Sequence, residues 1–487
     1  MKDAMKYLKL ICVLLFSALA LVACSDKDKD GEVRWDRKSL FMNYGETAVV
    51  GIGGKNIATF SISSVPDGWA TPEINTRTMS VTIVAPASAD DVANEDADSN
   101  NDGQVDFSGT IQLKGVTHGN EVVYASLFVS LETPEVDLSK QPANSYIANT
   151  PAALYRINAS VKGDGSAIPT ASVAVVWQTS TNLVKYLQLE NDGTATFYLA
   201  KDTDEEYIKR GNALIGAYDA DKNLLWSWHI WAADYDAEAE ALNYGKYTVM
   251  SRALGQLQND TEDKASILES YGMYYQAGRK DPFAGPSTYN ASKGVTASLY
   301  DGESNVVTIE AIEADSETGT YAYATAHPTH FLTVSDKNGS WDKGLTQEVK
   351  GWNTPKKSVN DPCPYGWRVA PAAAFDGAVI ADDLTISDAA SKYAEQYGWT
   401  LEKNGVQSFY FAGGRRVYAD ALIQNVFDES LTRNVAMEAQ PWVGYNWTAE
   451  GKTFAFWFSK ENPTQSGLRN DLSFSKANGM MVRCVKE

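Results

Sequence analysis

Short runs in which apolar and polar residues alternate fill the first part of the chain, from residue 32 to about residue 131. Gly, Pro, Asp and Asn, the residues that favour turns, separate these runs. A period of two places one side of each run in a core and the other in solvent. The pattern predicts an antiparallel, immunoglobulin-like β-sandwich over residues 32–132. Its strand candidates are TAVVGIGG, ATFSISSV, MSVTIVA, GTIQLKG and VVYASLFVSL.

A polar stretch, TPEVDLSKQPANSY, follows at residues 133–146. It has no apolar period, which indicates a linker between domains. Apolar runs then return, separated by the turn sequences NDG and DADKN. We expect a second β-sandwich over residues 147–235. Its strand candidates are ALYRINAS, ASVAVVWQTS, VKYLQLE, TATFYLA, GNALIGAYD and NLLWSWHIW.

The last of these runs contains LLWSWHIW, residues 224–231, in which both alternating sets of side chains are largely apolar. A strand that is buried on both faces explains this pattern most simply. An exposed aromatic platform, on which sugar rings would stack, is the alternative.

The composition changes at about residue 244, after which Gly and aromatic residues become frequent. Two segments, ASILESYGMYYQAGR and SDAASKYAEQYGW, have apolar residues at helical spacing and lie among strand-like runs. We therefore expect an α+β domain over residues 244–487. A chain of 487 residues is too long for one core, and the whole is predicted to be a mainly β protein of three domains.

The N-terminus has the pattern of an export signal, with three lysines ahead of the apolar run Leu10–Ala23. The run is shorter than the about 20 residues that a membrane-spanning helix needs. It closes on LVAC, which resembles the lipobox of bacterial lipoproteins, and SDKDKD after it resembles an acidic surface-export tether. The resemblance implies that residues 1–23 are removed, that Cys24 carries the lipid, that residues 24–31 form the tether, and that the protein is exposed on the outer membrane. Cleavage after Ala23 to give a soluble exported protein is the alternative.

The net charge limits the possible partners of the protein, and the cysteine content indicates a possible disulfide. The formal net charge of −20 argues against nucleic acid as a partner, because lysine and arginine must neutralise its phosphates. Cys12 would be removed with the signal and Cys24 would carry the lipid, so Cys363 and Cys484 would be the two thiols left in the mature protein. Two cysteines in an exported protein suggest one disulfide, with two free buried thiols as the alternative.

The segment DSNNDGQVD, at residues 98–106, matches the first part of the calcium-loop template D-x-[DN]-x-[DN]-G. The glycine allows the sharp turn that lets alternate oxygen atoms converge on one hard cation. The glutamate of the twelfth position is absent, and no helical pattern flanks the segment. Ca²⁺ binding in a β-hairpin and an acidic, solvated turn are both open. The ligands would be Asp98, Asn100, Asp102, Gln104 through its carbonyl group, and Asp106.

Catalytic signatures are scarce. The chain has four histidines and neither an H-E-x-x-H nor a G-x-S-x-G motif. The two histidines of HPTH, His327 and His330, have a spacing that could bind zinc on a helix, but Pro328 disfavours a helix there and a solvated loop is expected. The sequence therefore does not indicate an enzyme.

Five segments of the last third occur in the order seen in the Fibrobacter succinogenes major paralogous family. They are NYGKYTVMSRALGQ, YGMYYQAGRKDPFAGPS, NDPCPYGWRVAP, GYNWTAEGKTFAFWFS and GMMVRCVKE. The family's module is similar to C-type lectin-like folds, and the resemblance implies a disulfide from Cys363 to Cys484. The chain departs from the family at SRALGQ, where D-R-N-L-G-A is usual, which removes an acid and an amide.

The start of the first sandwich, WDRKSLFMNYGETAVVGI followed by VPDGWATPEI, resembles the BACON-type immunoglobulin-like modules of Bacteroidetes surface proteins. Together these resemblances imply a lipid-anchored surface protein that recognises an extracellular glycan or protein and has no catalytic activity of its own. A fimbria-associated structural subunit is the alternative, followed by a glycan-acting enzyme. Candidate ligand-binding aromatics are Trp442, Tyr445, Trp447 and Trp457, each of which could instead lie in the core.

Blocking lipoprotein signal cleavage tests the role of Cys24. We expect globomycin to leave the precursor uncut, and Cys24→Ala to release the protein from the membrane fraction or to strand it unprocessed. N-terminal sequencing and mass spectrometry of the mature protein are the measurements. A mature chain that begins at Ser25 and carries no lipid would contradict the prediction.

Overall fold

The computed structural model describes the chain in twelve stretches. They are residues 31–88, 108–202, 207–259, 269–285, 289–290, 295–296, 299–344, 351–352, 356–381, 398–424, 442–458 and 467–487. The chain forms two compact units, residues 1–134 and 135–487. No helix in the described part is long and apolar enough to cross a membrane.

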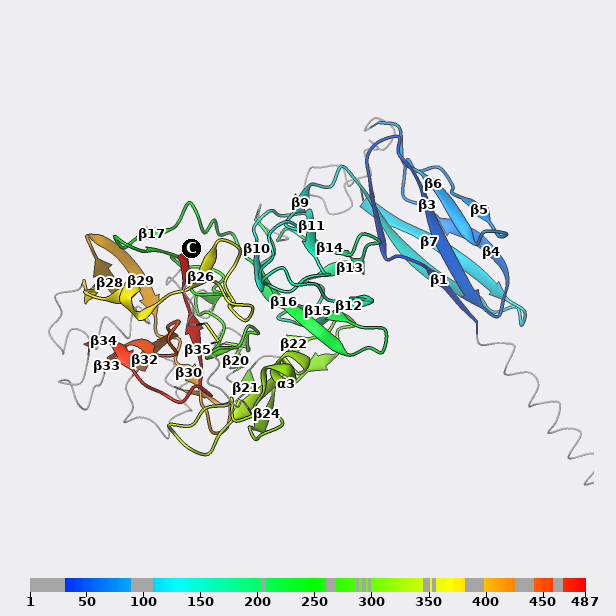
Figure 1. The fold of residues 1–487 in the computed structure, drawn as a ribbon. Helices are drawn as coiled ribbons and strands as arrows, with labels where there is room; N and C mark the ends of the chain where they lie inside the picture. Colours follow the sequence, from blue (N-terminus) through cyan, green and yellow to red (C-terminus); the bar gives the residue numbers. More distant parts are fainter. Residues whose placement is uncertain are drawn as a thin grey trace, which may run out of the picture. The chain divides into compact units, whose positions relative to one another are not determined.

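The first unit is a β-sandwich of two four-stranded sheets, as predicted (Figure 1). The buried side chains of both sheets form one core, which includes Trp35, Val81, Ile111 and Leu127. One sheet has the order β1 (Glu32–Trp35), β3 (Thr47–Lys55), β6 (Ser80–Val84), β5 (Glu73–Asn75). The other has the order β2 (Ser39–Met42), β8 (Val122–Leu131), β7 (Ser108–Thr117), β4 (Ile57–Ser64).

The alternation of the sequence explains these strands. In β7, Ile111 and Leu113 are fully buried, and Gln112 between them is not. β7 and β8 form a hairpin in which Asn120 takes a positive φ of 65°, a conformation that asparagine tolerates better than most residues. The segment GIGG, part of the strand candidate TAVVGIGG, lies inside β3.

The second unit begins with two further sheets. All six strand candidates of this region form strands. One sheet has the order β10 (Ser145–Ala148), β16 (Leu224–Ala232), β15 (Gly211–Tyr218), β12 (Ser172–Gln178), β22 (Leu299–Tyr300), β23 (Val306–Val307). The other has the order β13 (Lys185–Leu189), β14 (Thr194–Leu199), β11 (Ala153–Asn158), β9 (Glu135–Asp137).

The range 133–146 does not form the expected linker. It contains β9 and the first residues of β10, which pair in parallel with β11 and β16. Asn144 and Ser145 are fully buried despite their polar side chains. Backbone hydrogen bonds and buried polar partners hold this segment, and neither leaves an apolar pattern in the sequence.

The second sandwich and the C-terminal domain form one unit instead of two separate domains. β22 and β23, which follow residue 244, extend the sheet that contains β16. Trp177 and Trp231 of the sandwich strands lie in the same core cluster as Met273, Trp447 and the two disulfide cysteines. A shared core and a shared sheet therefore join the two parts.

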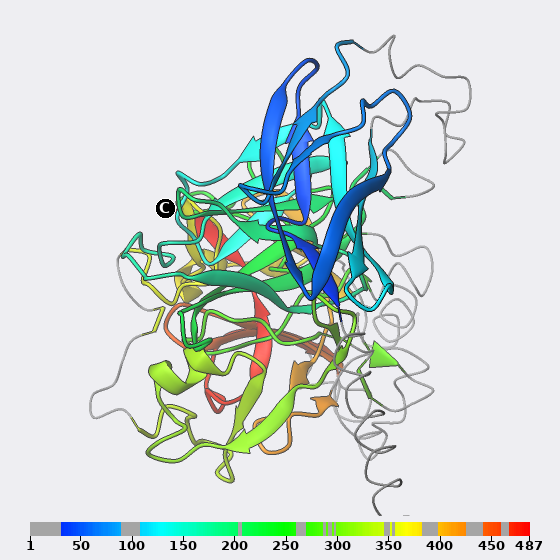
Figure 2. The same ribbon diagram turned by 90° about the vertical axis from the view of Figure 1, so that its right-hand side faces the viewer.

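The rest of the unit is a set of small sheets with long connections. Its last strands, drawn in red, lie inside the unit in both views (Figures 1 and 2). One sheet has the order β17 (Leu242–Asn243), β18 (Thr248–Val249), β36 (Cys484–Lys486), β26 (Trp367–Val369). The largest contains β31 (Ile423–Gln424), β30 (Arg415–Arg416), β35 (Gly479–Val482), β32 (Trp442–Trp447), β33 (Thr453–Phe458), β34 (Gly467–Leu472) and β19 (Tyr275–Gln276). The others are β20 (Tyr289–Asn290) with β21 (Val295–Thr296), β24 (Glu310–Glu313) with β25 (His330–Thr333), and β27 (Val379–Ile380) with β28 (Gly398–Lys403) and β29 (Val406–Phe411).

Helix is rare among the described residues. In the described part, α3 (Tyr321–Ala326) is an α-helix and η3 (Ala372–Phe375) is a 3₁₀ helix. The described end of the first expected helix contains β19, and Gly278 follows with a positive φ of 87°. Tyr274, Tyr275 and Gln276 are all buried, so the apolar run reflects burial on every side, which periodicity does not distinguish from a helix. Most of the second expected helix lies outside the described residues, and its last two residues begin β28.

Candidate functional site

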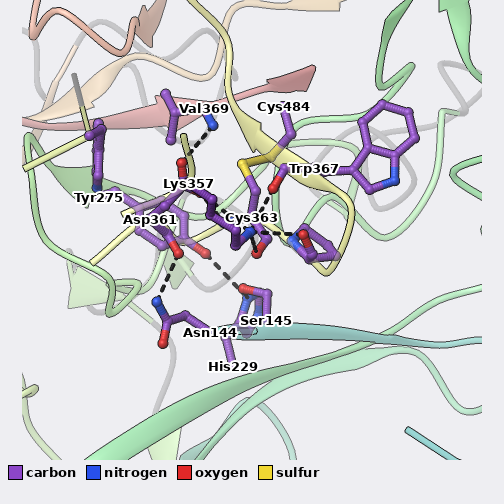
Figure 3. The surroundings of a disulfide bond; sticks show 12 residues. Asn144, Ser145, His229, Tyr275, Lys357, Asp361, Cys363, Trp367, Val369 and Cys484 are labelled. Atoms are coloured by element: carbon purple, nitrogen blue, oxygen red, sulfur yellow. Dashed lines mark hydrogen bonds and ion pairs between the residues drawn. A yellow bond between two sulfur atoms is a disulfide. The ribbon is translucent and has the colours of Figure 1, made fainter. Parts of the chain in front are cut away.

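A disulfide joins the loop that contains DPCPYGW to the last strand of the chain. Cys363 and Cys484 are bonded across 121 positions, and both are fully buried (Figure 3). β26 follows the loop and pairs antiparallel with β36, with Val369 opposite Cys484. The bond that the resemblance implies is therefore present, and it ties the C-terminal strand to residues 363–369.

Asp361 fixes the shape of this loop by binding its backbone N–H groups. Its carboxylate is buried and accepts hydrogen bonds from the backbone N–H groups of Cys363 and Val369, both at 2.9 Å. The bond to Cys363 is the local Asp turn, in which the side chain binds the backbone two residues on. The carboxylate thus holds Cys363 and the start of β26 around one point.

Lys357 fixes the same loop from its carbonyl side. Its Nζ donates to the carbonyl oxygens of Cys363 at 2.5 Å, Pro364 at 2.8 Å and Trp367 at 2.6 Å. It also lies 3.6 Å from Oδ1 of Asp361. Three carbonyl groups and a carboxylate therefore surround one ammonium group, which has three protons to donate.

Burial acts against the charges of this pair. It raises the pKa of Asp361, and the attraction of Lys357 and the two backbone N–H groups oppose that shift. Burial lowers the pKa of Lys357, and Asp361 opposes that shift in turn. Removing one partner would leave the other charge buried with weaker compensation, which is costly in proteins.

Asn144 connects the loop to the sandwich strands. Its Nδ2 donates to the carbonyl oxygens of Val359 at 2.7 Å and Asp361 at 2.8 Å (Figure 3). Its Oδ1 accepts from Nε1 of Trp226, on β16, at 3.0 Å. One buried amide therefore links β16 to the segment that precedes the disulfide.

His229 is the centre of a neighbouring buried network. Nδ2 of Asn212 donates to the carbonyl oxygen of Gly255, which leaves Oδ1 of Asn212 facing Nε2 of the imidazole at 2.8 Å. Nε2 is thus the donor, and Nδ1 accepts from Ser145 Oγ or Tyr275 OH, each at 3.2 Å. Burial lowers the pKa of His229 to about 3.

A serine, a lysine and an aspartate meet where β16 contacts the loop after β19. Nζ of Lys280 lies 2.5 Å from Oδ1 of Asp281 and also donates to Ser227, whose Oγ donates to Asp281 at 2.6 Å. Hydroxyl, amine and carboxylate groups are the parts of a nucleophilic site. All three side chains are buried, however, and Lys280 also stacks over Trp226 at 4.5 Å. In this structure the cluster joins two segments and meets no solvent.

Two of the four candidate ligand-binding aromatics are not on the surface. Tyr445 is 5% exposed and contacts Phe474 edge to face, and Trp447 is fully buried with Nε1 donating to the carbonyl oxygen of Tyr275. Both belong to the central core, because β32 lies between β33 and β35. The side chains of Trp442 and Trp457 lie outside the described residues. Phe454 and Phe456 of the neighbouring strand β33 are also buried.

The remaining sequence candidates either lie outside the described residues or are buried. Cys24 and the calcium ligands Asp98, Asn100, Asp102, Gln104 and Asp106 lie outside the described residues. In LLWSWHIW, the side chains of Trp226, Trp228 and Ile230 on one face, and those of Ser227, His229 and Trp231 on the other, are buried, so the strand is no sugar platform. Within the described part, no group of three or more His, Cys, Asp or Glu is arranged to hold a metal ion.

The HPTH segment forms no helix, as expected, but it is only in part the expected solvated loop. Pro328 is buried, and His330 begins strand β25. Helix α3 ends at Ala326, and the His327 and His330 rings stack 4.8 Å apart. Nδ1 of His330 binds Tyr323 OH at 2.9 Å, and its Nε2 lies 3.7 Å from Glu310. Burial and the neighbouring His327 lower the pKa of His330.

The sequence does not identify the buried charged residues that connect the sandwich strands to the loops near the disulfide. Lys280 and Asp281 are adjacent charges of the kind that usually face solvent, and Lys357 lies in a polar stretch. Among these residues, only Asp361 could be identified from the sequence, because an Asp two residues before the disulfide cysteine can form an Asp turn. The other charges are buried by tertiary packing, which short-range patterns do not record.

Comparison with known proteins gives no family. No family model matches the chain, and no curated protein matches it. Among the 162 solved chains that are similar to part of it, three illustrate the match. They are extracellular cadherin domains 1–4 of protocadherin gamma B7 (10% identity, 42% of this chain and 50% of that chain, TM-score 0.14), Drosophila N-cadherin EC1-4 (10%, 42% and 50%, 0.16) and the N-terminal eight Ig domains of Down Syndrome Cell Adhesion Molecule (9%, 45% and 31%, 0.14). The chain spans half or less of those chains, and TM-scores this low do not identify a fold family.

Removing the disulfide should weaken the second unit alone. In the double variant Cys363→Ser, Cys484→Ser we expect the free energy of unfolding of residues 135–487 to fall by about 4 to 5 kcal/mol, because the unfolded chain regains the freedom of a loop of 121 residues. Calorimetry and limited proteolysis are the measurements, and the transition of the first unit is the internal control. Equal protease resistance of variant and parent at residues 357–369 would show that the bond is dispensable.

His229 should make the second unit sensitive to acid. The unfolded chain binds a proton at this histidine with a pKa near 6.5, whereas the folded chain does so only near 3. Stability is therefore present above about pH 6.5 and is lost as the pH falls towards 3, by about 1.4 kcal/mol per pH unit. Thermal unfolding from pH 7 to pH 4 should show a smaller decline in His229→Gln than in the parent. His118→Gln, at an exposed position of the first unit, is the control and should leave the decline unchanged.

Proposed function

We propose that this protein is exported, is held on the outer membrane by lipid on Cys24, and binds an extracellular glycan or protein without catalysing a reaction. The observation that carries the proposal is the buried disulfide between Cys363 and Cys484. Disulfides persist in oxidising compartments and are rare in the cytosol. The export signal and the LVAC sequence support the same location.

The two units have different roles in this proposal. The first sandwich, as a BACON-like module, is a spacer that carries the second unit away from the membrane. The second unit contains the C-type lectin-like module of the major paralogous family and makes the contact. Support comes from DPCPYGWRV, the most specific segment of the resemblance, which coincides with the loop that Asp361 and Lys357 fix.

Among the residues that the structure describes, Tyr365 is the strongest candidate for contact with the ligand. Its side chain is 54% exposed, although it lies two residues from the buried Cys363. The loop is held by the disulfide, by Asp361 and by Lys357, so an aromatic ring is presented on a rigid backbone. Exposed tyrosines stack on sugars and anchor protein interfaces, and a preordered loop loses little entropy on binding.

A binding screen of the protein from Ser25 to Glu487 tests this proposal. We expect selective retention of one glycan or extracellular protein class, with affinity at least about tenfold lower in Tyr365→Ala, a loss of about 1.4 kcal/mol. Tyr124→Ala is the matched control, because Tyr124 is 60% exposed in the first unit. Equal losses in both variants would contradict the role of Tyr365. Release of free sugars from the array would favour a glycan-acting enzyme, and absence of any ligand would contradict recognition.

A further inference from the structure

The first sandwich has four edge strands, and one of them differs from the rest. β1, β2 and β5 have three or four residues, whereas β4 has eight. Proteins keep sheet edges short or charged, because unpaired N–H and C=O groups otherwise pair with another chain. β4 reads IATFSISS and contains neither a charged residue nor proline. It is therefore the one long, uncharged edge of the described sandwich.

The free side of β4 is regular at its centre. Within the described residues, β4 pairs with β7 and with no other strand. Its register is irregular near both ends, but Thr59–Ile62 pair in order with residues 113–116 of β7. Thr59 and Ser61 are exposed, while Phe60 and Ile62 pack against the core of the sandwich.

This central segment is complementary to itself. In an antiparallel pair about a two-fold axis at Ser61, each Ser61 lies opposite the same residue of the other copy. Phe60 of each copy then lies opposite Ile62 of the other. Opposed residues of antiparallel strands point to the same face, so apolar side chains meet on the core side and hydroxyl groups on the outer side.

We propose that two copies of this protein associate through β4, joining their four-stranded sheets into one continuous sheet. The contact is isologous, as in most two-fold dimers, and its hydrogen bonds come from the backbone of Phe60–Ile62, the regularly paired residues that an axis at Ser61 maps onto themselves. A second copy is the occupant because the register and the side-chain polarity of the strand fit it to a copy of itself. This contact lies in the first unit and is independent of the ligand surface proposed for the second.

Cross-linking at the two-fold axis tests the proposal directly. In the protein from Ser25 to Glu487, which keeps every described residue, the two native cysteines are bonded to each other, so Ser61→Cys adds a single thiol. Mild oxidation should convert this variant to a disulfide-linked dimer, because the two thiols face each other across the axis. Ser126→Cys is the matched control, since Ser126 is exposed on the central strand β8 of the same sheet. Equal cross-linking of both variants would overturn the pairing.

Sedimentation of the unmodified protein supplies the second measurement. We expect a monomer–dimer equilibrium that shifts with concentration, is lost in Ser61→Lys, and is retained in Ser126→Lys. Two lysines placed opposite each other repel, and a charge on an edge strand is a common natural barrier to pairing. A parent protein that remains monomeric at all concentrations, or a dimer that survives Ser61→Lys, would show that β4 is not the interface.

Discussion

The buried carboxylate of Asp361 is the interaction on which the C-terminal unit depends. It binds the backbone N–H groups of Cys363 and Val369, and Lys357 binds the carbonyl groups on the other side of the same loop. Without these charges, the backbone N–H and C=O groups of the loop would need hydrogen bonds from water or from a neighbouring strand. The two charges therefore shape the loop from within, and this shape places Cys363 beside Cys484.

Other buried cations of this unit act in the same way. Arg279 and Arg416 are almost fully buried, and burial lowers the pKa of each to about 10, so both remain charged at neutral pH. Many of the strands here have only two residues, which leaves long connections whose carbonyl groups need donors. A guanidinium group offers five N–H donors in a fixed fork and can satisfy several carbonyls at once. Those bound are Ala324 and His330 by Arg279, and Ala284 and Ala421 by Arg416.

The sequence predicts the strands of residues 32–235 because their side chains alternate or form apolar runs between turn residues. It fails where burial comes from distant partners. Asn144 and Ser145 look like linker residues, yet their partners are Trp226, Asp361 and His229, which lie far along the chain. Tyr445 looks like a surface aromatic because a ring on a half-buried strand and one on a central strand share the same local pattern. The sequence also predicts the Cys363–Cys484 pair, because these are the two cysteines outside the N-terminal segment that has the pattern of a lipoprotein signal.

The same networks constrain how the recognition proposed above could take place. Ser227, His229 and Asn144 join the sandwich strands to the loops around the disulfide through buried hydrogen bonds, so these parts cannot separate without exposing charged groups such as Asp281 and Asp361. Binding that required such separation would have to supply that free energy. Recognition by residues already presented on fixed backbone avoids it. A rigid surface, with an exposed ring such as Tyr365 near its covalent clamp, is therefore favoured over a site that opens on binding.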